Sequence, residues 1–142
     1  DLPRAVAAAF DGATVSVAVH DGLFDLQLHQ RGMLRPLRAA ELSDGTLRFL
    51  LWAAALTSPQ PPSLMVLNEP ETSLHPELVA PLAGLIHSAA QRTQVVVITH
   101  APTLRDGLDT DGGAIELVRD FGETRVNGQG LLDAPAWHWG SR

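Results

Sequence analysis

The sequence of 142 residues contains no lysine, because all ten of its basic residues are arginine. A phosphate-binding loop of the Walker A form, G-x-x-x-x-G-K-[ST], needs its lysine to reach the β- and γ-phosphates of a nucleotide. The chain therefore cannot contain such a loop. The same absence excludes an enzyme that forms a Schiff base on a lysine of this chain.

Cysteine is also absent, which excludes a disulfide framework and a thiolate metal site. No run of eighteen apolar residues occurs, so we expect no membrane span. The first residues, Asp1-Leu2-Pro3-Arg4, lack the basic and apolar regions of a secretory signal, and a cytoplasmic location is the expectation. The chain does not begin with methionine, which fits a piece of a longer protein.

Basic residues are too few for a nucleic-acid clamp, because the net charge is −6 and phosphate binding needs clustered basic side chains. What the chain does have is a hydrophobic fraction of 45% and a charged fraction of 18%, values typical of a globular domain. A complete protein containing this chain could still bind DNA, but this part alone is not expected to do so.

The first forty residues carry strand signals. Apolar residues alternate on both sides of Asp21-Gly22, a favoured hairpin turn, and predict a β-hairpin over residues 13–30. An Ala-rich helix over 4–10 and a short third strand over 33–37 complete this region. Further on, helical spacing predicts a helix over 46–56, and a last antiparallel pair is expected at 114–118 and 124–126.

Two short apolar runs, Leu64–Leu67 and Gln94–Ile98, are typical of strands buried on both faces. Helical spacing over 78–89 joins them, with a first turn and a kink expected near Pro81. Two strands joined by such a helix are expected to be parallel. Ligands of parallel sheets bind at the carboxyl ends of the strands, so Asn68, Glu69 and His100 are expected to share one site.

Four segments resemble, in order, the motifs of an ABC-type ATPase head. Leu42-Ser43-Asp44-Gly45-Thr46 resembles the signature loop, and Leu64 to Glu69 resembles a Walker B strand with its glutamate. Ser73-Leu74-His75-Pro76 resembles the D-loop, and Val97-Ile98-Thr99-His100 resembles the strand that carries the switch histidine. The chain thus resembles the carboxy-terminal lobe of the RecF-like and chromosome-maintenance-like branch, also called AAA-type predicted ATPases.

This resemblance implies an α/β fold: a partial P-loop NTPase in three layers, α/β/α, with a mostly parallel sheet, a β-hairpin appendage and no Walker A lobe. We expect a single lobe over 1–142. Its hairpin region covers 1–40, its motif core covers 41–108, and a terminal strand pair and tail cover 109–142. The tail contains Trp137 and Trp139, which we interpret as packing or partner-contact residues.

The resemblance also implies roles for the site residues. Glu69 would be the general base for ATP hydrolysis, and His100 would sense the γ-phosphate. Asn68 stands where the family usually has an aspartate that holds Mg²⁺, commonly through water, and asparagine keeps an oxygen but loses the charge. The expected nucleotide-binding residues, which act across a homodimer, are Ser43, Asp44, Gly45, Thr46, Ser73 and His75.

Several alternatives remain open at this stage. Ser43 could serve only as the cap of the following helix. The whole lobe could be a non-catalytic dimerisation or partner-binding module, with Asn68 marking lost catalysis. A metal-dependent hydrolase is a third reading, because Glu69, Glu71, His75 and His100 are suitable zinc or manganese ligands, although they show no recognised spacing. In the ATPase reading the cofactors are ATP and Mg²⁺, and the Walker A lobe comes from sequence outside this chain.

Overall fold

The structure, a computed structural model, describes residues 1–108, 113–120 and 122–128. The chain divides into two compact units, Asp1–Leu108 and residues 109–142. In the second unit, β6 (Leu117–Asp120) pairs antiparallel with β7 (Glu123–Val126). The predicted terminal pair is thus confirmed, although its first strand begins at Leu117 rather than at Ala114. The tail with Trp137 and Trp139 lies outside the described residues.

The first unit begins with α1 (Leu2–Ala9) and the predicted hairpin, formed by β1 (Thr14–His20) and β2 (Leu23–His29). Asp21 (φ 51°) and Gly22 (φ 78°) both adopt the left-handed conformation, which matches the twist of a tight hairpin. The third strand, β3 (Leu37–Arg38), is shorter than the predicted 33–37. Met33 and Leu34 are exposed, so their side chains make no packing contacts that would favour an earlier start of the strand.

The remaining elements of the first unit follow the motif segments. A 3-10 turn, η1 (Ala39–Glu41), leads into α2 (Asp44–Leu56), and β4 (Leu64–Asn68) follows. A second 3-10 turn, η2 (Pro76–Leu78), precedes α3 (Val79–Ala90), and the unit ends with β5 (Gln94–Ile98) and α4 (Pro102–Gly107). The predicted break lies before Val79 and not at Pro81. Pro81 is accommodated in the first turn of α3, because backbone N–H groups there have no acceptor within the helix.

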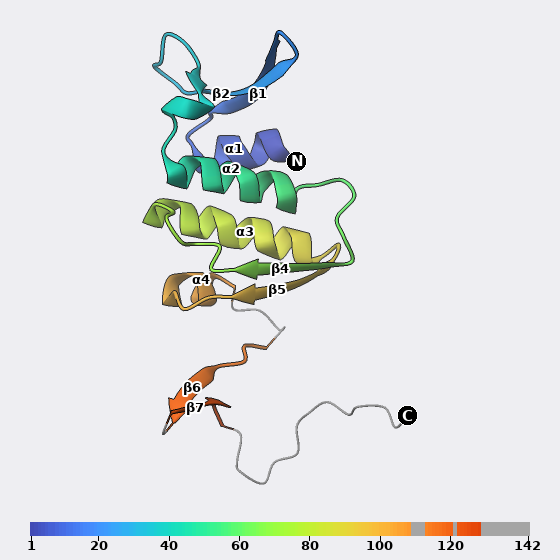
Figure 1. The fold of residues 1–142 in the computed structure, drawn as a ribbon, viewed down its shortest axis with the longest axis vertical. Coiled ribbons are helices and arrows are strands. Elements are labelled where there is room, and N and C mark those ends of the chain that lie inside the picture. Colours follow the sequence, from blue (N-terminus) through green and yellow to red (C-terminus); the bar gives the residue numbers. More distant parts are fainter. Residues whose placement is uncertain (109–112, 121, 129–142) are drawn as a thin grey trace. The chain divides into compact units, whose positions relative to one another are not determined.

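The main core lies between the helices and one face of the β4–β5 sheet. Figure 1 shows α1, α2 and α3 stacked between the hairpin and this sheet. The buried residues come from α2, β4, η2, α3 and α4 and are Phe49, Ala53, Leu56, Leu67, Leu78, Leu82, Ala83, Ile86, Ala89 and Leu104. A smaller cluster under the hairpin contains Val6, Ala13, Leu28 and Leu50. Among the described residues, no helix combines the length and the apolar character that crossing a membrane requires.

Within the first unit, residues 1–108, the β4–β5 sheet is covered on one face only, whereas the sequence predicts strands buried on both faces. The strands pair in parallel, as predicted, from Leu64 opposite Gln94 to Asn68 opposite Ile98. On one face, Met65, Leu67, Val95 and Val97 pack against the core. On the other face four apolar side chains remain 42–58% exposed, and these are Leu64, Val66, Val96 and Ile98.

The described residues therefore form two of the three expected layers. Helix α4 contributes Leu104 to the same core as α3, so it lies on the covered side of the sheet. A continuous apolar run is the pattern of a strand with both faces covered, and the described chain supplies only one cover. The α/β class and the parallel pairing are confirmed, whereas the third layer is not found among these residues.

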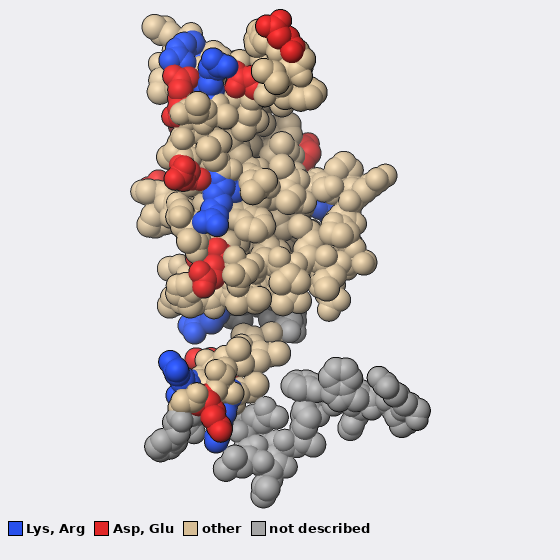
Figure 2. Space-filling model, viewed as in Figure 1, with Lys and Arg blue, Asp and Glu red and all other residues tan. Residues whose placement is uncertain are grey.

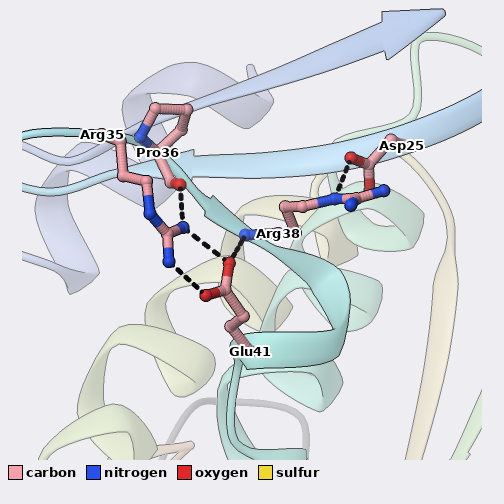
Figure 3. Close-up of polar contacts among 5 residues, drawn as sticks. All are labelled: Asp25, Arg35, Pro36, Arg38 and Glu41. Atoms are coloured by element: carbon pink, nitrogen blue, oxygen red, sulfur yellow. Dashed lines mark hydrogen bonds and ion pairs between the residues drawn. The ribbon is translucent and has the colours of Figure 1, made fainter. Parts of the chain in front are cut away.

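A polar cluster on the hairpin side fixes the segment before the signature loop (Figure 3). Arg35 makes a two-pronged contact with Glu41, with Nη1–Oε2 and Nη2–Oε1 distances of 2.9 and 2.6 Å. The backbone N–H of Arg38 also donates to Glu41 Oε2 at 3.0 Å, and its side-chain Nε donates to Asp25 at 2.7 Å. The hydrogen bond from Arg35 is the main cause that lowers the pKa of Glu41 from 4.5 to about 2. Glu41 thereby ties Arg35 and β3 to η1, directly before Leu42 and Ser43, and Arg38 ties β3 to Asp25 in β2.

This contact predicts a pH-dependent stability. Because the folded chain lowers the pKa of Glu41, the stabilisation is fully present above its ordinary pKa of 4.5 and is lost as the pH falls toward about 2. We expect the stability difference between wild type and Glu41→Gln to shrink over that range, as measured by urea unfolding. In an Arg35→Gln background the pH-dependent difference should become smaller, with the remainder due to the backbone N–H of Arg38. A difference that persists unchanged there would contradict the assignment to Arg35.

The uncovered apolar face predicts that residues 1–142 alone self-associate, because exposed apolar patches and strand edges attract other chains. Val66→Lys should weaken the association by placing a charge on this face, as measured by sedimentation velocity over a range of concentrations. Val17→Lys on the hairpin is a matched control, because both valines are 58% exposed. A monomer at all concentrations, or an equal effect of both variants, would show that this face does not drive association.

Candidate functional site

The parallel pairing brings the predicted residues to one edge of the sheet. Asn68 is the last residue of β4, and the backbone N–H of Glu69 donates to the carbonyl of Ile98 at 2.7 Å. Glu69 Oε1 then lies 3.3 Å from His100 Nδ1, with side chains 44% and 78% exposed. By alternation, Asn68 follows Leu64 and Val66 on the uncovered face. The structure thus groups the three residues that the strand-end argument selected, in a place accessible from solution.

The loop after β4 holds two residues in an unfavourable backbone conformation. Glu69 (φ 45°) and Ser73 (φ 66°) occupy the left-handed region, which costs a non-glycine residue about 1–3 kcal/mol. A turn from the N–H of Thr72 to the carbonyl of Glu69, at 3.1 Å, closes the loop behind the strand, and Pro70 is fully buried beneath it. The strained backbone turns the Glu69 carboxylate toward His100 at the sheet edge.

The start of α2 forms a capped helix terminus. Ser43 Oγ accepts a hydrogen bond from the N–H of Thr46 at 3.2 Å and lies 2.9 Å from the Thr46 hydroxyl. Asp44 occupies the first turn, where a negative charge interacts favourably with the helix dipole. Ser43 is therefore the N-cap, which also explains why α2 begins at Asp44 rather than at Thr46. Both Ser43 and Asp44 are exposed.

The first turns of α2 pack against the predicted D-loop segment of the same chain. A side chain at Gly45 would meet the carbonyl oxygen of Ser73 at 2.5 Å, so only glycine fits there without movement. One turn later, Arg48 Nη1 donates to the carbonyl of Thr72 at 3.0 Å. The predicted signature and D-loop segments thus meet at Gly45 and Ser73, and the Arg48–Thr72 hydrogen bond joins the residues that flank them.

His75 caps η2 at the end of this loop. Its Nδ1 accepts a hydrogen bond from the N–H of Glu77 at 3.4 Å and lies 3.6 Å from the Glu77 carboxylate. The His75 side chain is 67% exposed, so its other ring nitrogen is accessible. These contacts are local and do not test the predicted role of His75 at a dimer interface.

Three further residues hold the site together, and the sequence reading assigned them no such role. Thr99 donates to Glu71 at 2.5 Å, which links the loop after β4 to the end of β5. Arg48 donates to the carbonyl of Thr72 and links α2 to the same loop. The described residues contain no group of three or more His, Asp or Glu placed to hold a metal ion, so the metal-hydrolase reading lacks a ligand set there.

Charged side chains are scattered over the face shown in Figure 2, with basic and acidic groups lying next to one another near the hairpin end. The pairs Arg35–Glu41 and Arg38–Asp25 belong to that end. Within the part of the first unit that this view shows, basic groups do not gather into one patch, so that surface presents no field of a single sign to a polyanion.

The close contact at Gly45 predicts that adding a single methyl group there destabilises the folded chain. Gly45→Ala should lower the free energy of unfolding by about 1–3 kcal/mol, because the methyl group must displace the D-loop backbone. Gly84→Ala is the control, since Gly84 lies in α3 with no atom within 4 Å of an added Cβ. That variant should instead stabilise the chain by up to about 1 kcal/mol through helix propensity. Chemical denaturation measures both, and equal effects would contradict the close approach.

Residues 4–106 match the AAA_21 family, described as "AAA domain, putative AbiEii toxin, Type IV TA system", over more than half of the chain. A search of curated proteins finds no match.

Solved structures of SMC heads share the fold. A chain from "Structural biochemistry of ATP-driven dimerization and DNA stimulated activation of SMC ATPases" aligns with a TM-score of 0.71 and 17% identity, over 88% of this chain and 78% of that one. The SMC head domain from Thermotoga maritima aligns with a TM-score of 0.63 and 19% identity, over 88% of this chain and 44% of that one. The Smc head domain from Pyrococcus furiosus, with an extended coiled coil and bound to the C-terminal domain of ScpA, aligns with a TM-score of 0.67 and 16% identity. The alignment covers 88% of this chain and 32% of that one.

At these identities the likeness establishes the fold, and the chain spans less than half of the Thermotoga and Pyrococcus chains. The family match and the fold agree with the resemblance to the RecF-like and chromosome-maintenance-like branch, which is thereby confirmed. The chain belongs to the AAA_21 family and has the fold of an ABC-type ATPase head.

Proposed function

We propose that this chain is the lobe of a dimeric ATPase head that supplies the signature loop, the Walker B residues, the D-loop and the switch histidine. The observation that carries the proposal is the juxtaposition of Glu69 and His100, 3.3 Å apart at the carboxyl edge of two parallel strands. Ligands of parallel sheets bind at this edge. Hydrolysis requires a carboxylate that can accept a proton from water and a donor that can meet the γ-phosphate.

In this mechanism Glu69 polarises the attacking water and accepts its proton. The oxygen of that water forms a bond to the γ-phosphorus while the bond from phosphorus to the β–γ bridging oxygen breaks, giving ADP and phosphate. His100 donates a hydrogen bond to the γ-phosphate and so distinguishes ATP from ADP. The exposure of both side chains, 44% and 78%, leaves them free to meet a nucleotide from outside this lobe.

The donor set at the sheet edge fits Mg²⁺. The amide oxygen of Asn68 and the carboxylate of Glu69 are hard oxygen donors on consecutive residues, and Mg²⁺ usually keeps several waters while using few protein ligands. Asn68 would hold the ion through water, and the ion would neutralise phosphate charge when bound. Because Asn68 lacks a charge, the affinity for Mg²⁺ should be lower than with an aspartate.

The start of α2 supports a contact with the nucleotide of a second subunit. Ser43, Asp44, Gly45 and Thr46 form an exposed or partly exposed helix terminus, whose N–H groups and dipole favour an anion. Gly45 keeps this terminus against Ser73, so the signature loop and the D-loop form one surface. Ser73 and His75 would lie at the homodimer interface on that surface.

Two observations support a separate lobe that provides the Walker A loop. The chain contains no lysine. The uncovered apolar face of β4 and β5 ends in Asn68, so a further layer packed there would lie beside the nucleotide site. We propose that the Walker A lobe of the complete protein covers this face. The SMC study named above reports ATP-driven dimerisation and DNA stimulation of those ATPases, and the complete protein could share both.

Asn68 favours one alternative. A lobe that lost the acidic Walker B residue could retain dimerisation or partner binding without turnover. ATP turnover by the complete protein distinguishes the two functions.

Glu69→Gln in the complete protein tests the proposal. It keeps size and hydrogen bonding but removes the base, so turnover should fall about 10²–10⁴-fold while ATP binding persists. The variant should accumulate as an ATP-bound dimer, as measured by sedimentation with ATP. Glu77→Gln is the control for removing a carboxylate charge, because Glu77 lies in η2 after this loop and its side chain is 88% exposed.

Asn68→Asp tests the magnesium side separately. The added charge should lower the Mg²⁺ concentration needed for half-maximal turnover, with a modest change in maximal turnover. If wild type is inactive and this variant restores turnover, the non-catalytic alternative is correct for the natural chain. If neither Glu69→Gln nor Asn68→Asp alters turnover or dimerisation, Leu64 to Glu69 is not a Walker B segment and the ATPase proposal fails.

A further inference from the structure

One hydroxyl group connects the two loops that carry Glu69 and His100. Thr99 Oγ1 donates to Glu71 Oε1 at 2.5 Å, across 28 positions of sequence, and accepts from the N–H of Ala101 at 3.0 Å. Both contacts are partly buried, in contrast to the exposed Glu69 and His100 on either side. The hydroxyl therefore shapes the backbone at His100 and ties it to the loop after β4.

Glu71 lies in the loop after β4, whose backbone conformation is not one that its residues prefer. Glu69 has a φ of 45°, a region that non-glycine residues avoid. Two turns keep it there: the N–H of Thr72 donates to the carbonyl of Glu69 at 3.1 Å, and the N–H of Leu74 donates to the carbonyl of Glu71 at 3.0 Å. Glu71 lies inside both turns, so anchoring its side chain also restrains the backbone of Glu69.

Stability alone does not account for a glutamate at this position. Within the described part of the chain, Glu71 Oε2 is buried and has no hydrogen-bond partner. A buried carboxylate oxygen without a hydrogen-bond donor is unfavourable. A side chain that leaves fewer buried acceptors without a donor would make a purely structural link at a lower free-energy cost. The hydrogen bond between Thr99 and Glu71 instead joins the segments that carry Glu69 and His100, the two residues to which we assign the chemistry.

Resting on the proposed function, we propose that Glu71 and Thr99 are positioning residues that hold Glu69 and His100 at their working separation. Glu69 is one residue before Pro70 and two before Glu71, while His100 directly follows Thr99. Fixing Glu71 to Thr99 sets the distance between the general base and the γ-phosphate donor. Without this link the strained backbone at Glu69 relaxes, and the base moves away from the line of attack.

The test is Thr99→Val in the complete protein, a change of similar size that removes the hydroxyl. We expect kcat for ATP hydrolysis to fall by about 10- to 100-fold, the effect of a small misplacement of reacting groups, with little change in KM for ATP. Thr99→Ser, which restores the hydroxyl, should recover most of the activity. Adding Glu71→Ala to Thr99→Val should cause little further loss, because both changes break the same contact.

Thr93→Val is the matched control at the opposite end of β5. The Thr93 hydroxyl also joins two loops, because it donates to the carbonyl of Pro62, but it lies at the strand end away from the site. We expect this variant to lower the melting temperature without lowering kcat. A second readout, independent of turnover, is amide hydrogen exchange, which should accelerate at Glu69 in Thr99→Val and not in Thr93→Val.

The outcomes separate this inference from the proposed function. If Glu69→Gln abolishes turnover while Thr99→Val leaves kcat and Glu69 exchange unchanged, the positioning role is wrong and the ATPase proposal stands. Equal losses in Thr99→Val and Thr93→Val would show a general loss of stability and also overturn it. If wild type and Asn68→Asp both lack turnover, the ATPase proposal fails, and unchanged exchange at Glu69 would then independently reject the link.

Discussion

β4 and β5 pair in parallel from Leu64 opposite Gln94 to Asn68 opposite Ile98, and the candidate site depends on this register. The register is specified by burial, because Leu67 must face the core and its neighbours then face outward. A shift by one residue would bury Asn68 and expose Leu67, since side chains alternate along a strand. The same pairing ends both strands together, so Glu69 and His100 leave the sheet side by side.

The helix before β4 depends on this arrangement in turn. Gly45 and Arg48 contact backbone carbonyls of the loop that follows β4, at Ser73 and Thr72. Because these atoms are in close contact, a displacement of the loop would also displace the start of α2. If the proposed dimeric head is correct, these contacts would couple the residues assigned to one nucleotide to those assigned to the other.

The strain in this region supports a functional reading. Glu69 and Ser73 are two of the four non-glycine residues with positive φ among the described residues, and the other two, Asp11 and Asp21, lie in turns beside the hairpin. Asp tolerates the left-handed conformation because its short side chain bonds locally, whereas Glu gains no such benefit. The unfavourable backbone at Glu69 is kept because the surrounding contacts determine it, which is typical of sites where geometry serves chemistry.

The sequence alone determined the hairpin, the helix before β4, the parallel βαβ unit, the absence of a Walker A lysine and the grouping of Asn68, Glu69 and His100. These follow from local patterns, since apolar periodicity, turn residues and strand-end position act over a few residues. The sequence did not predict α4 or the bounds of β3. Tertiary structure decided that only one face of the β4–β5 sheet is covered, because burial depends on which layers are present. It also decided the contacts of Gly45, Arg48, Glu71 and Thr99. The two hydrogen bonds among them, Arg48 to Thr72 and Thr99 to Glu71, join residues 24 and 28 positions apart. No local pattern specifies which distant carbonyl or carboxylate a side chain will meet.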